Sequence, residues 1–338
     1  MYLAPLNYDR FFKKVFSDIN VAKMFLEDFL EEKIEEIEQL KNKHRVTDDA
    51  NIVEFDYRCK IKGNYIIIDM QQWYKPDVSQ RFYIYHALNS SLQLEEMPDK
   101  ALLVEEKTKK GSIKIKEIKD YRVIEPVLTL IWMVDDSLGY ENNYISFYLT
   151  PHLIEEFLRD VKMWKNKNIE EIQEERKKIL ELLENDTKDM NFLSKNKLIF
   201  MFQKNIIKSN KLKKYVAWFN FAEKTRNKKN RKEDFEEFVE DVRFKEPIKR
   251  LCKEILTKDD IKYIDEEDEI WEKVRRYEKG NIETGIKEGI KEGIKEGIKE
   301  GEKSKAIEIA KNLLDVLDIE MISKKTGLSM EEIEKLKK

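Results

Sequence analysis

Two aspartates beside apolar strand residues are the clearest candidates for chemistry in this sequence. Asp56 interrupts the β-branched and aromatic run of residues 52–61, and Asp69 directly follows the triplet Ile66-Ile67-Ile68. A carboxylate in such surroundings costs free energy unless it is paired or bound to a cation. Two of them on adjacent strands suit a hard cation such as Mg²⁺, which takes one or two carboxylates and keeps several waters. The alternative interpretation is a pair of edge carboxylates that face water.

A divalent cation held there would act on phosphate esters. It would polarise a phosphodiester, make a bound water a better nucleophile and neutralise the negative charge that develops during the reaction. Cysteine and histidine offer few competing sites, because Cys59 and Cys252 lie outside any CxxC or Cys/His cluster. That argues against a disulfide framework and a zinc site, and it favours a reducing, cytoplasmic setting. His86 lies in an apolar helical pattern and is interpreted as a packed helix residue rather than a base or ligand.

The two aspartates are expected on the two strands of a β-hairpin. Residues 52–61 and 65–70 are rich in β-branched and aromatic side chains, and Lys62-Gly63-Asn64 separates them. Gly and Asn tolerate the positive φ that a tight turn needs. The pattern therefore predicts that Asp56 and Asp69 lie on adjacent strands.

Helices and further strands are expected to complete an α/β unit around this hairpin. Apolar side chains at three- and four-residue spacing predict two short helices within residues 8–29 and a third over residues 79–94. The nearly continuous apolar run of residues 123–134 is typical of a buried central strand, and residues 144–149 alternate like one more strand. Residues 1–150 therefore form the predicted α/β unit.

The composition fits a chain with a real core and heavily charged helices. Hydrophobic residues make up 41% and charged residues 39%, against about 25% charged in typical globular domains. The net charge of −3 gives no global basic signal for nucleic acid, so any such contact must rest on a local patch. Residues 95–122 are Lys-rich and are predicted to be a loop or a frayed hairpin around Gly111. No apolar run long enough to span a membrane and no secretory signal pattern occurs, so no membrane partner is expected.

Beyond Pro151 the pattern changes to long helical stretches, and an all-helical C-terminal region is predicted. Basic clusters at residues 204–214 and 226–232 lie beside Trp218 and neighbouring phenylalanines. They could track a phosphate backbone, although such runs are more often solvated helix faces over an ordinary core. The predicted helices cover residues 152–164, 169–184, 190–208, 211–224, 233–256 and 266–279.

Residues 285–301 are a perfect internal repeat, GIKEGIKEGIKEGIKEG. Four residues advance about 400° around a helix of ~3.6 residues per turn, so the Ile and Gly positions form adjacent stripes. Each Gly lowers helix stability by roughly 1 kcal/mol relative to Ala. The stripes favour close self-association of helices, whereas the glycines favour a flexible linker, and the sequence leaves both open.

The end of the chain is predicted to be a small helical unit with helix-turn-helix spacing. Ser329 and Glu332 form a capping-box pair at the start of its last helix. That helix begins Met330-Glu331-Glu332, and carboxylates repel phosphate. A packing or oligomerisation element is therefore favoured over one that reads DNA.

The motif around the hairpin resembles the D...(D/E)xK core of the PD-(D/E)xK nuclease superfamily. The matching residues are Asp56, the Gly63 turn and Asp69-Met70-Gln71. More narrowly, the chain is similar to the Rpn family of recombination-promoting, transposase-like nucleases, in which the last motif usually reads E-x-Q. Further resemblance to that family lies in the opening YDRFFKKVF, in Arg81 with Tyr85, and in the GIKE repeat with its TGLS tail.

The resemblance implies a nuclease-like core, a mixed β-sheet flanked by helices, followed by the all-helical region. It covers the first part of the chain and the tail. The implied domains are a nuclease-like domain at 1–150, a helical region at 151–280, a repeat helix or linker at 281–303 and a small helical tail at 304–338.

The resemblance also implies a site. Asp56 and Asp69 would ligate Mg²⁺ (or Mn²⁺), and the Met70 carbonyl would be a further ligand. Gln71 would occupy the lysine position of the superfamily, but a glutamine cannot take up a proton or carry a positive charge. The activation of water would then fall to the metal itself or to a lysine elsewhere, such as Lys60 or Lys75. The implied accessory residues are Asp9, Lys60, Lys75 and Arg81.

The sequence supports two functions from different classes. The first, implied by the resemblance, is a Mg²⁺-dependent DNA endonuclease that cleaves phosphodiester bonds in DNA recombination or in mobile elements. The second is a catalytically weak or inactive DNA-binding or scaffold protein that forms a homo-oligomer through its helical tail. The two aspartates favour the first function, whereas the missing lysine and the absence of net positive charge favour the second.

Overall fold

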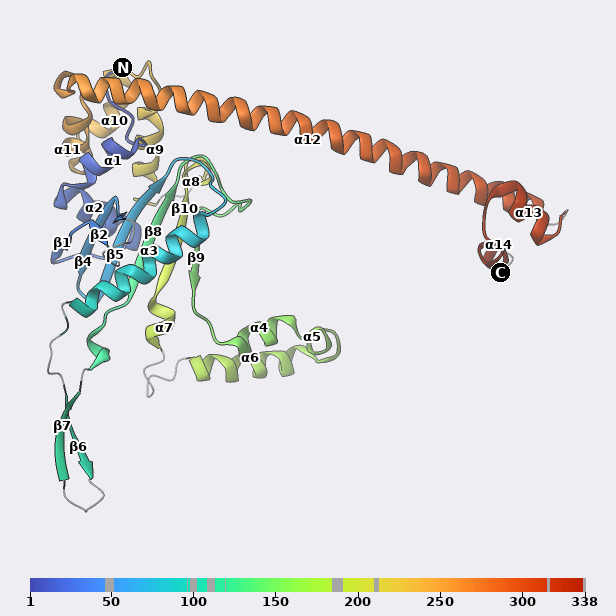
Figure 1. Cartoon of the computed structure of the whole chain (residues 1–338), viewed down its shortest axis with the longest axis horizontal. Helices are drawn as coiled ribbons and strands as arrows, with labels where there is room; N and C mark the ends of the chain where they lie inside the picture. The colour runs from blue at the N-terminus through green and yellow to red at the C-terminus, as the bar shows by residue number, and fades with distance from the viewer. Residues whose placement is uncertain are drawn as a thin grey trace. The chain divides into compact units, whose positions relative to one another are not determined.

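The computed structural model describes most of the chain and divides it into two compact units. The units are residues 1–264 and residues 265–338, and each is described by itself (Figure 1). The described residues are 1–45, 52–95, 97, 102–107, 113–118, 120–183, 191–209, 213–314 and 317–336.

A six-stranded mixed sheet forms the centre of the first unit. Its strand order is β1-β4-β5-β8-β10-β9. The three strands β5, β8 and β10 run parallel to one another, and the remaining three are antiparallel to their neighbours. The strand bounds are β1 (Ile37–Gln39), β4 (Tyr57–Ile61), β5 (Asn64–Gln71), β8 (Val127–Met133), β10 (Lys197–Phe202) and β9 (Tyr144–Tyr148).

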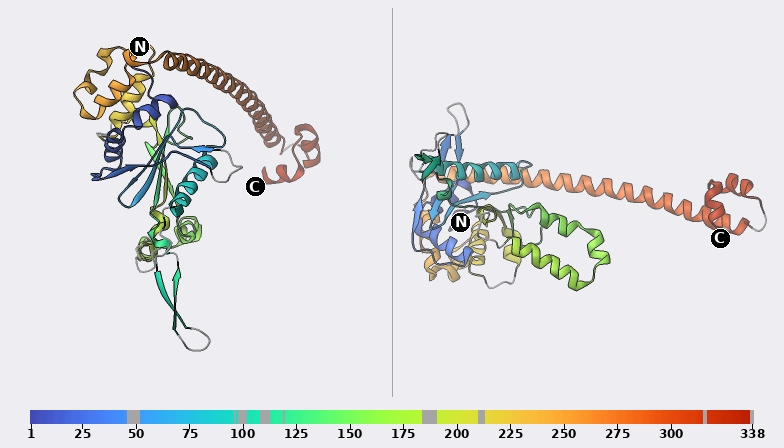
Figure 2. Two further views of the ribbon diagram at one scale, coloured as in Figure 1. Left: turned by 60° about the vertical axis from the view of Figure 1, so that its left-hand side comes forward. Right: turned by 90° about the horizontal axis from the view of Figure 1, so that it is seen from below.

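Helices cover both faces of this sheet (Figure 2). On one face, α3 (Val78–Leu92) packs through Phe82 against a cluster that includes Ile131 and Phe200. On the other face, α1 (Asp9–Phe16), α2 (Ile19–Leu30) and α9 (Val216–Thr225) surround the fully buried Trp132. Residues 131 and 132 point to opposite faces because side chains alternate along a strand. The mixed α/β architecture with helices on the sheet is therefore confirmed.

The predicted hairpin is present, but its first strand is shorter than expected. β4 and β5 are antiparallel and turn at Gly63, whose φ is +78°. The expected strand over residues 52–61 breaks at Asp56, and the part before the break pairs elsewhere. That part is β3 (Ile52–Glu54), which forms a separate two-stranded sheet with β2 (Lys43–Arg45).

The expectation that everything beyond Pro151 is helical is wrong at one place. Residues 197–202, inside a stretch predicted as a helix, form β10 between β8 and β9. The sequence KLIFMF is a short continuous apolar run, and such a run does not distinguish a buried strand from a buried helix. Burial on both faces between two strands decides in favour of the strand.

The remaining elements of the first unit are mostly short helices. In the sequence, α4 to α7 lie between β9 and β10, the other α-helices of this group follow β10, and α12 continues into the second unit. Their bounds are α4 (His152–Arg159), α5 (Val161–Asn166), α6 (Ile169–Leu183), α7 (Asn191–Lys195), α8 (Gln203–Lys208), α10 (Glu236–Val239), α11 (Val242–Leu251) and α12 (Lys258–Leu313), with 3₁₀ turns at Gln93–Glu95, Tyr121–Val123, Lys232–Phe235 and Lys253–Ile255.

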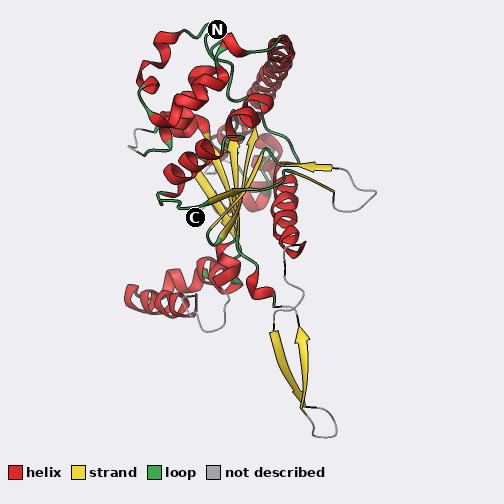
Figure 3. Cartoon of the chain, turned by 90° about the vertical axis from the view of Figure 1, so that its left-hand side faces the viewer, coloured by secondary structure: helices red, strands yellow, loops and turns green. Residues whose placement is uncertain are grey.

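The Lys-rich segment contains a two-stranded ribbon, in agreement with the hairpin alternative. β6 (Leu102–Lys107) and β7 (Ile113–Ile118) pair antiparallel and form a sheet of their own. Figure 3 shows this ribbon as a separate arm. Gly111, the expected turn centre, lies outside the described residues.

The second unit consists of the long part of α12 followed by α13 (Ile319–Thr326) and α14 (Met330–Leu336). The repeat lies within α12, so its backbone is helical. The two short helices pack on α12 through Ala310, Ile322 and Ile333. The predicted capping box is confirmed, because Ser329 N donates to Glu332 Oε2 at 3.0 Å and Glu332 N donates to Ser329 Oγ at 3.2 Å.

Two absences concern the described part of the chain. Its two cysteines are both free, as expected. A search of its helices finds none that combines the length and the apolar character needed to cross a membrane.

Trp132 should be a main support of the first unit. Its ring lies 4.0 Å from Phe219 and 5.7 Å from Phe25, centroid to centroid. We expect Trp132→Ala to lower the free energy of unfolding by about 3–5 kcal/mol, because it removes a large buried aromatic. Urea unfolding followed by circular dichroism measures this. The control Trp164→Ala, at a tryptophan that is 46% exposed, should change stability by less than about 1 kcal/mol; equal effects would contradict the packing described.

Candidate metal-binding site

The two aspartates lie next to each other and are almost fully buried. Asp56 is 6% exposed, in the bend before β4, and Asp69 is 0% exposed, inside β5. The last ladder pair, Tyr57 with Ile68, sets them opposite each other. Asp56 N donates to Asp69 Oδ2 at 3.4 Å, and Met70 N donates to Asp56 Oδ2 at 2.8 Å.

One carboxylate oxygen of this pair has no hydrogen bond. Asp69 Oδ1 is buried without a hydrogen-bond partner. Its nearest cation is the Arg81 guanidinium, whose Nη2 lies 3.7 Å away, beyond hydrogen-bond reach. Buried carboxylate oxygens are normally hydrogen-bonded, so this oxygen is a free acceptor where a cation could bind.

Arg81 connects α3 to the end of β5. Residues 69 and 71 share one face of β5, since side chains alternate along a strand, and α3 covers that face. Arg81 Nη1 donates to Gln71 Oε1 at 2.9 Å, and its Nε donates to the Tyr85 hydroxyl at 3.3 Å. Gln71 Nε2 in turn donates to the Trp73 carbonyl at 2.7 Å. Both ends of the Gln71 amide are therefore engaged within the protein.

Lys13 of α1 is the lysine that the structure places at Asp56. Its Nζ lies 3.4 Å from Asp56 Oδ1, 3.1 Å from Asp9 Oδ1 and 3.3 Å from Glu54 Oε1. Asp9, expected as an accessory acid, thus joins the site through Lys13. Lys13 is not among the site residues predicted from the sequence. The available signal was the four-residue spacing from Asp9, which puts the two on one helix face.

The other two lysines considered from the sequence lie elsewhere. Lys60 is paired with Tyr65 near the hairpin turn, with its ammonium 4.8 Å from the Tyr65 ring centroid. Asp56 is at the opposite end of β4. Lys75 is exposed in the segment between β5 and α3. Arg81, by contrast, is part of the site.

Burial raises the pKa of both aspartates. For Asp56, burial is the main cause of a pKa well above the usual range, and the charges of Asp69 and Asp9 add to it. For Asp69, burial raises the pKa to about 7, against the lowering effect of Arg81. The charges of Asp56 and Asp9 together raise the pKa of Lys13 although burial opposes this. Two neighbouring buried carboxylates are unfavourable when both are ionised. A cation bound between them would stabilise their charged forms.

The donor set fits a hard cation with few protein ligands. Among the described residues, no group of three or more His, Cys, Asp or Glu side chains could hold a metal ion. The two aspartates would therefore supply two carboxylates and leave most of the remaining positions to water, which suits Mg²⁺. A structural zinc site would need four protein ligands.

His86 is not part of this site. Its Nδ1 lies 3.0 Å from the Thr129 hydroxyl, between α3 and β8. Burial lowers the pKa of His86 to about 4, so the ring is neutral at physiological pH. These contacts match the interpretation as a packed helix residue.

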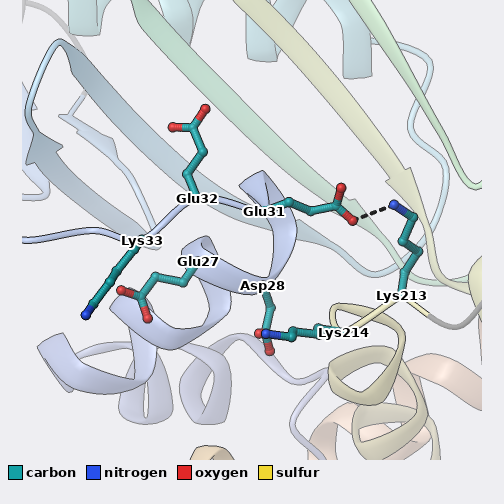
Figure 4. A pocket seen from close by; sticks show the side chains of 7 residues that line it. All are labelled: Glu27, Asp28, Glu31, Glu32, Lys33, Lys213 and Lys214. Atoms are coloured by element: carbon teal, nitrogen blue, oxygen red, sulfur yellow. Dashed lines mark hydrogen bonds and ion pairs between the residues drawn. The ribbon is translucent and has the colours of Figure 1, made fainter.

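Figure 4 shows a charged surface pocket whose lining includes neither Asp56 nor Asp69. It has a volume of about 600 Å³ and is lined by four acidic and three lysine side chains at the end of α2 and before α9. Lys213 Nζ lies 2.6 Å from Glu31 Oε1, and Asp28 accepts from Trp218 Nε1 at 2.8 Å. These groups pair within the protein, and no site aspartate lines the pocket.

Comparison with known proteins found no relative of this chain. A scan against protein-family models and searches of curated proteins and of solved structures each found no match to the chain.

The pH dependence of stability tests the burial of Asp69. Its pKa of about 7 in the folded chain exceeds the ~3.9 of an unfolded aspartate. Between these values the native state binds more protons than the unfolded state, so the contribution of this group to stability is lost as pH rises. We expect Asp69→Asn to be more stable than the parent at pH 8 by about 1–3 kcal/mol, with the difference shrinking towards pH 4.5.

Urea unfolding of both proteins across this pH range measures the difference. Glu155→Gln, which removes an exposed surface ion pair with Arg159, is the matched control and should follow the parent. Parallel pH curves for the parent and Asp69→Asn would contradict the raised pKa.

Proposed function

We propose that this chain is a Mg²⁺-dependent DNA endonuclease with a PD-(D/E)xK-like core. The supporting observation is the buried pair Asp56 and Asp69, held together by backbone hydrogen bonds and leaving Asp69 Oδ1 without one. The setting we propose, DNA recombination or mobile elements, rests on the resemblance to the Rpn family alone.

Each site residue has a role that follows from its contacts. Asp56 and Asp69 would hold Mg²⁺ or Mn²⁺, with the Met70 carbonyl as a further ligand. When bound, the ion supplies a polarised phosphodiester and a more acidic water. Lys13 has a raised pKa, so it stays protonated and acts as a fixed positive charge beside the phosphate, not as a base.

Gln71 serves as a positioning residue in this proposal. Its carbonyl oxygen accepts from Arg81 and its amide nitrogen donates to the Trp73 carbonyl. It therefore orients the Arg81 guanidinium beside Asp69. Arg81 can then stabilise negative charge on the substrate, since guanidinium groups recognise phosphate through paired donors.

Plasmid cleavage tests the proposed activity. With Mg²⁺ present we expect the parent to nick or linearise plasmid DNA, and Asp56→Asn and Asp69→Asn to cut at least about 100-fold more slowly, because each removes one carboxylate ligand. Glu155→Gln should cut like the parent. Circular dichroism checks that all variants fold. If the two asparagine variants cleave as fast as the parent, the assignment is wrong.

A non-catalytic DNA-binding scaffold is the second candidate. The observation that favours it is the engagement of Gln71 on both sides, since this residue replaces the lysine of the superfamily and transfers no proton. Titration calorimetry with MgCl₂ separates the two candidates. Magnesium binding that Asp69→Asn abolishes supports the nuclease, whereas intact DNA binding without magnesium binding supports the scaffold.

We further propose that the chain forms homo-oligomers through α12. Six glycines at residues 280–301 lie within this helix. Isolated helices are marginal in water even when Ala-rich, and each glycine weakens a helix by roughly 1 kcal/mol. A second copy packed along the Ile and Gly stripes of the repeat would compensate this loss.

Light scattering tests the association. Removal of residues 285–338 should lower the mass from an oligomer to that of the monomer. Removal of residues 304–338 alone keeps the repeat and should leave the oligomer in place. An unchanged mass after the longer truncation would refute association through the repeat.

A further inference from the structure

The outer face of α3 is uncovered and carries large apolar side chains. The inner face packs through Phe82, Leu88 and Leu92, which are buried. On the opposite face, Tyr83 is 65% exposed and Ile84 is 54% exposed. Figure 1 shows α3 in front of the sheet, and no described helix of the first unit lies in front of it. A helix that is apolar on both faces is normally buried on both, so this outer face suits a partner.

The same part of α3 carries no charge. Residues 82–94 contain no Asp, Glu, Lys or Arg, although these residues make up 39% of the chain. His86 contacts Thr129, and its pKa of about 4 keeps the ring neutral. Ser91 Oγ donates to the Ala87 carbonyl at 2.9 Å, so this hydroxyl already has a hydrogen bond within the helix. The outer face can therefore be buried without removing a charge from water.

The exposed residues of α3 recur at the spacing of a helix-packing stripe. Gln80, Ile84, Ala87 and Ser91 are separated by four, three and four residues, and all four are exposed. Residues at this spacing lie along one side of a helix. The bulky side chains, Tyr83 and Ile84, come before Ala87, and the small side chain of Ser91 comes after it. The outer face is therefore bulky in its first half and small in its second half.

A second copy of the helix in the antiparallel direction matches this difference in size. With the two-fold axis at Ala87, Tyr83 of one copy faces Ser91 of the other, and Ile84 faces Ser90. Each bulky side chain then meets a small one, as ridges meet grooves when helices pack. A parallel pair would instead set bulky side chains against each other. The face is thus complementary to itself, which favours a second copy over an unrelated partner.

We propose that this chain forms a two-fold dimer through antiparallel packing of α3 on α3 of a second copy. The contact is separate from the association through α12 and does not depend on the proposed catalytic activity. Arg81 keeps its contacts with Gln71 and Asp69 within its own copy. It is six residues from Ala87, so the two Arg81 residues would lie about 18 Å apart along the helices. The dimer would therefore hold two candidate sites at a fixed spacing.

Cysteine crosslinking of the full chain tests the contact. At an interaxial distance of about 8–10 Å and a Cα radius of about 2.3 Å, the two Cα atoms of residue 87 lie within roughly 6 Å, which a disulfide can span. We expect Ala87→Cys to form a covalent dimer when an oxidant is added. Ser79→Cys is the matched control, because residue 79 is exposed on the same helix but lies about 24 Å along the axis from its counterpart. This control and the parent, whose own cysteines are Cys59 and Cys252, should stay uncrosslinked.

A mixture of two variants tests the direction of the helices. Tyr83→Cys and Ser91→Cys should crosslink to each other when mixed, because these positions face each other in the antiparallel pair. Tyr83→Cys alone should not crosslink, since the two copies of residue 83 lie about 12 Å apart along the axis.

Light scattering gives an independent measurement. Ala87→Glu should lower the mass by about half at the same protein concentration, because it sets two carboxylates against each other at the axis. Ser79→Glu, on the same helix, should keep the mass of the parent. Circular dichroism checks that all variants fold.

Several outcomes would overturn the inference. These are no covalent dimer from Ala87→Cys, an equal yield from Ser79→Cys, self-crosslinking of Tyr83→Cys, or an unchanged mass of Ala87→Glu. A partner other than a second copy would produce the first of these results. The mixture of Tyr83→Cys and Ser91→Cys serves if Ala87→Cys does not fold. Loss of association through α12 would leave the crosslink at residue 87 in place, so the two contacts are tested separately.

Discussion

The hydrogen bond from Met70 N to the Asp56 carboxylate, 2.8 Å long, is the interaction on which the site depends. A side-chain acceptor here takes the place of the backbone carbonyl that would continue the β4–β5 ladder. The ladder ends at Tyr57, and the chain before it leaves for the small β2–β3 sheet. The same bond therefore ends the strand and fixes Asp56 against Asp69.

The charges around this pair come from both layers of helices. Lys13 approaches Asp56 from α1, and Arg81 approaches Asp69 from α3 on the other face of the sheet. Neither cation contacts its aspartate alone. Lys13 also pairs with Asp9 and Glu54, and Arg81 also donates to Gln71 and Tyr85. Burial outweighs both cations and keeps the pKa of each aspartate raised. Folding thus leaves the site short of positive charge, which is the condition that favours a metal ion.

Local pattern predicted the parts of this arrangement that local chemistry decides. The Gly63 turn set the hairpin, and the apolar run of β8 marked a central strand that is buried throughout. What failed depends on contacts distant in sequence. β10 became a strand because β8 and β9 flank it, and Lys13 reaches Asp56 only because α1 packs on the sheet beside Trp132. The spacing of apolar residues in α1 predicts a helix. It does not predict which acid a charged residue on the other face of that helix will contact.

The position of Arg81 disfavours a second cation, such as a lysine, at residue 71. A lysine at this position would bring an ammonium to the Arg81 guanidinium, which now donates to Gln71 Oε1 at 2.9 Å. The change would replace a hydrogen-bond acceptor with a like charge at a buried position, where repulsion is weakly screened. Arg81 and a neutral acceptor at residue 71 therefore go together. Arg81 of α3 and Lys13 of α1 supply positive charge to the site, so the glutamine does not leave it without cations.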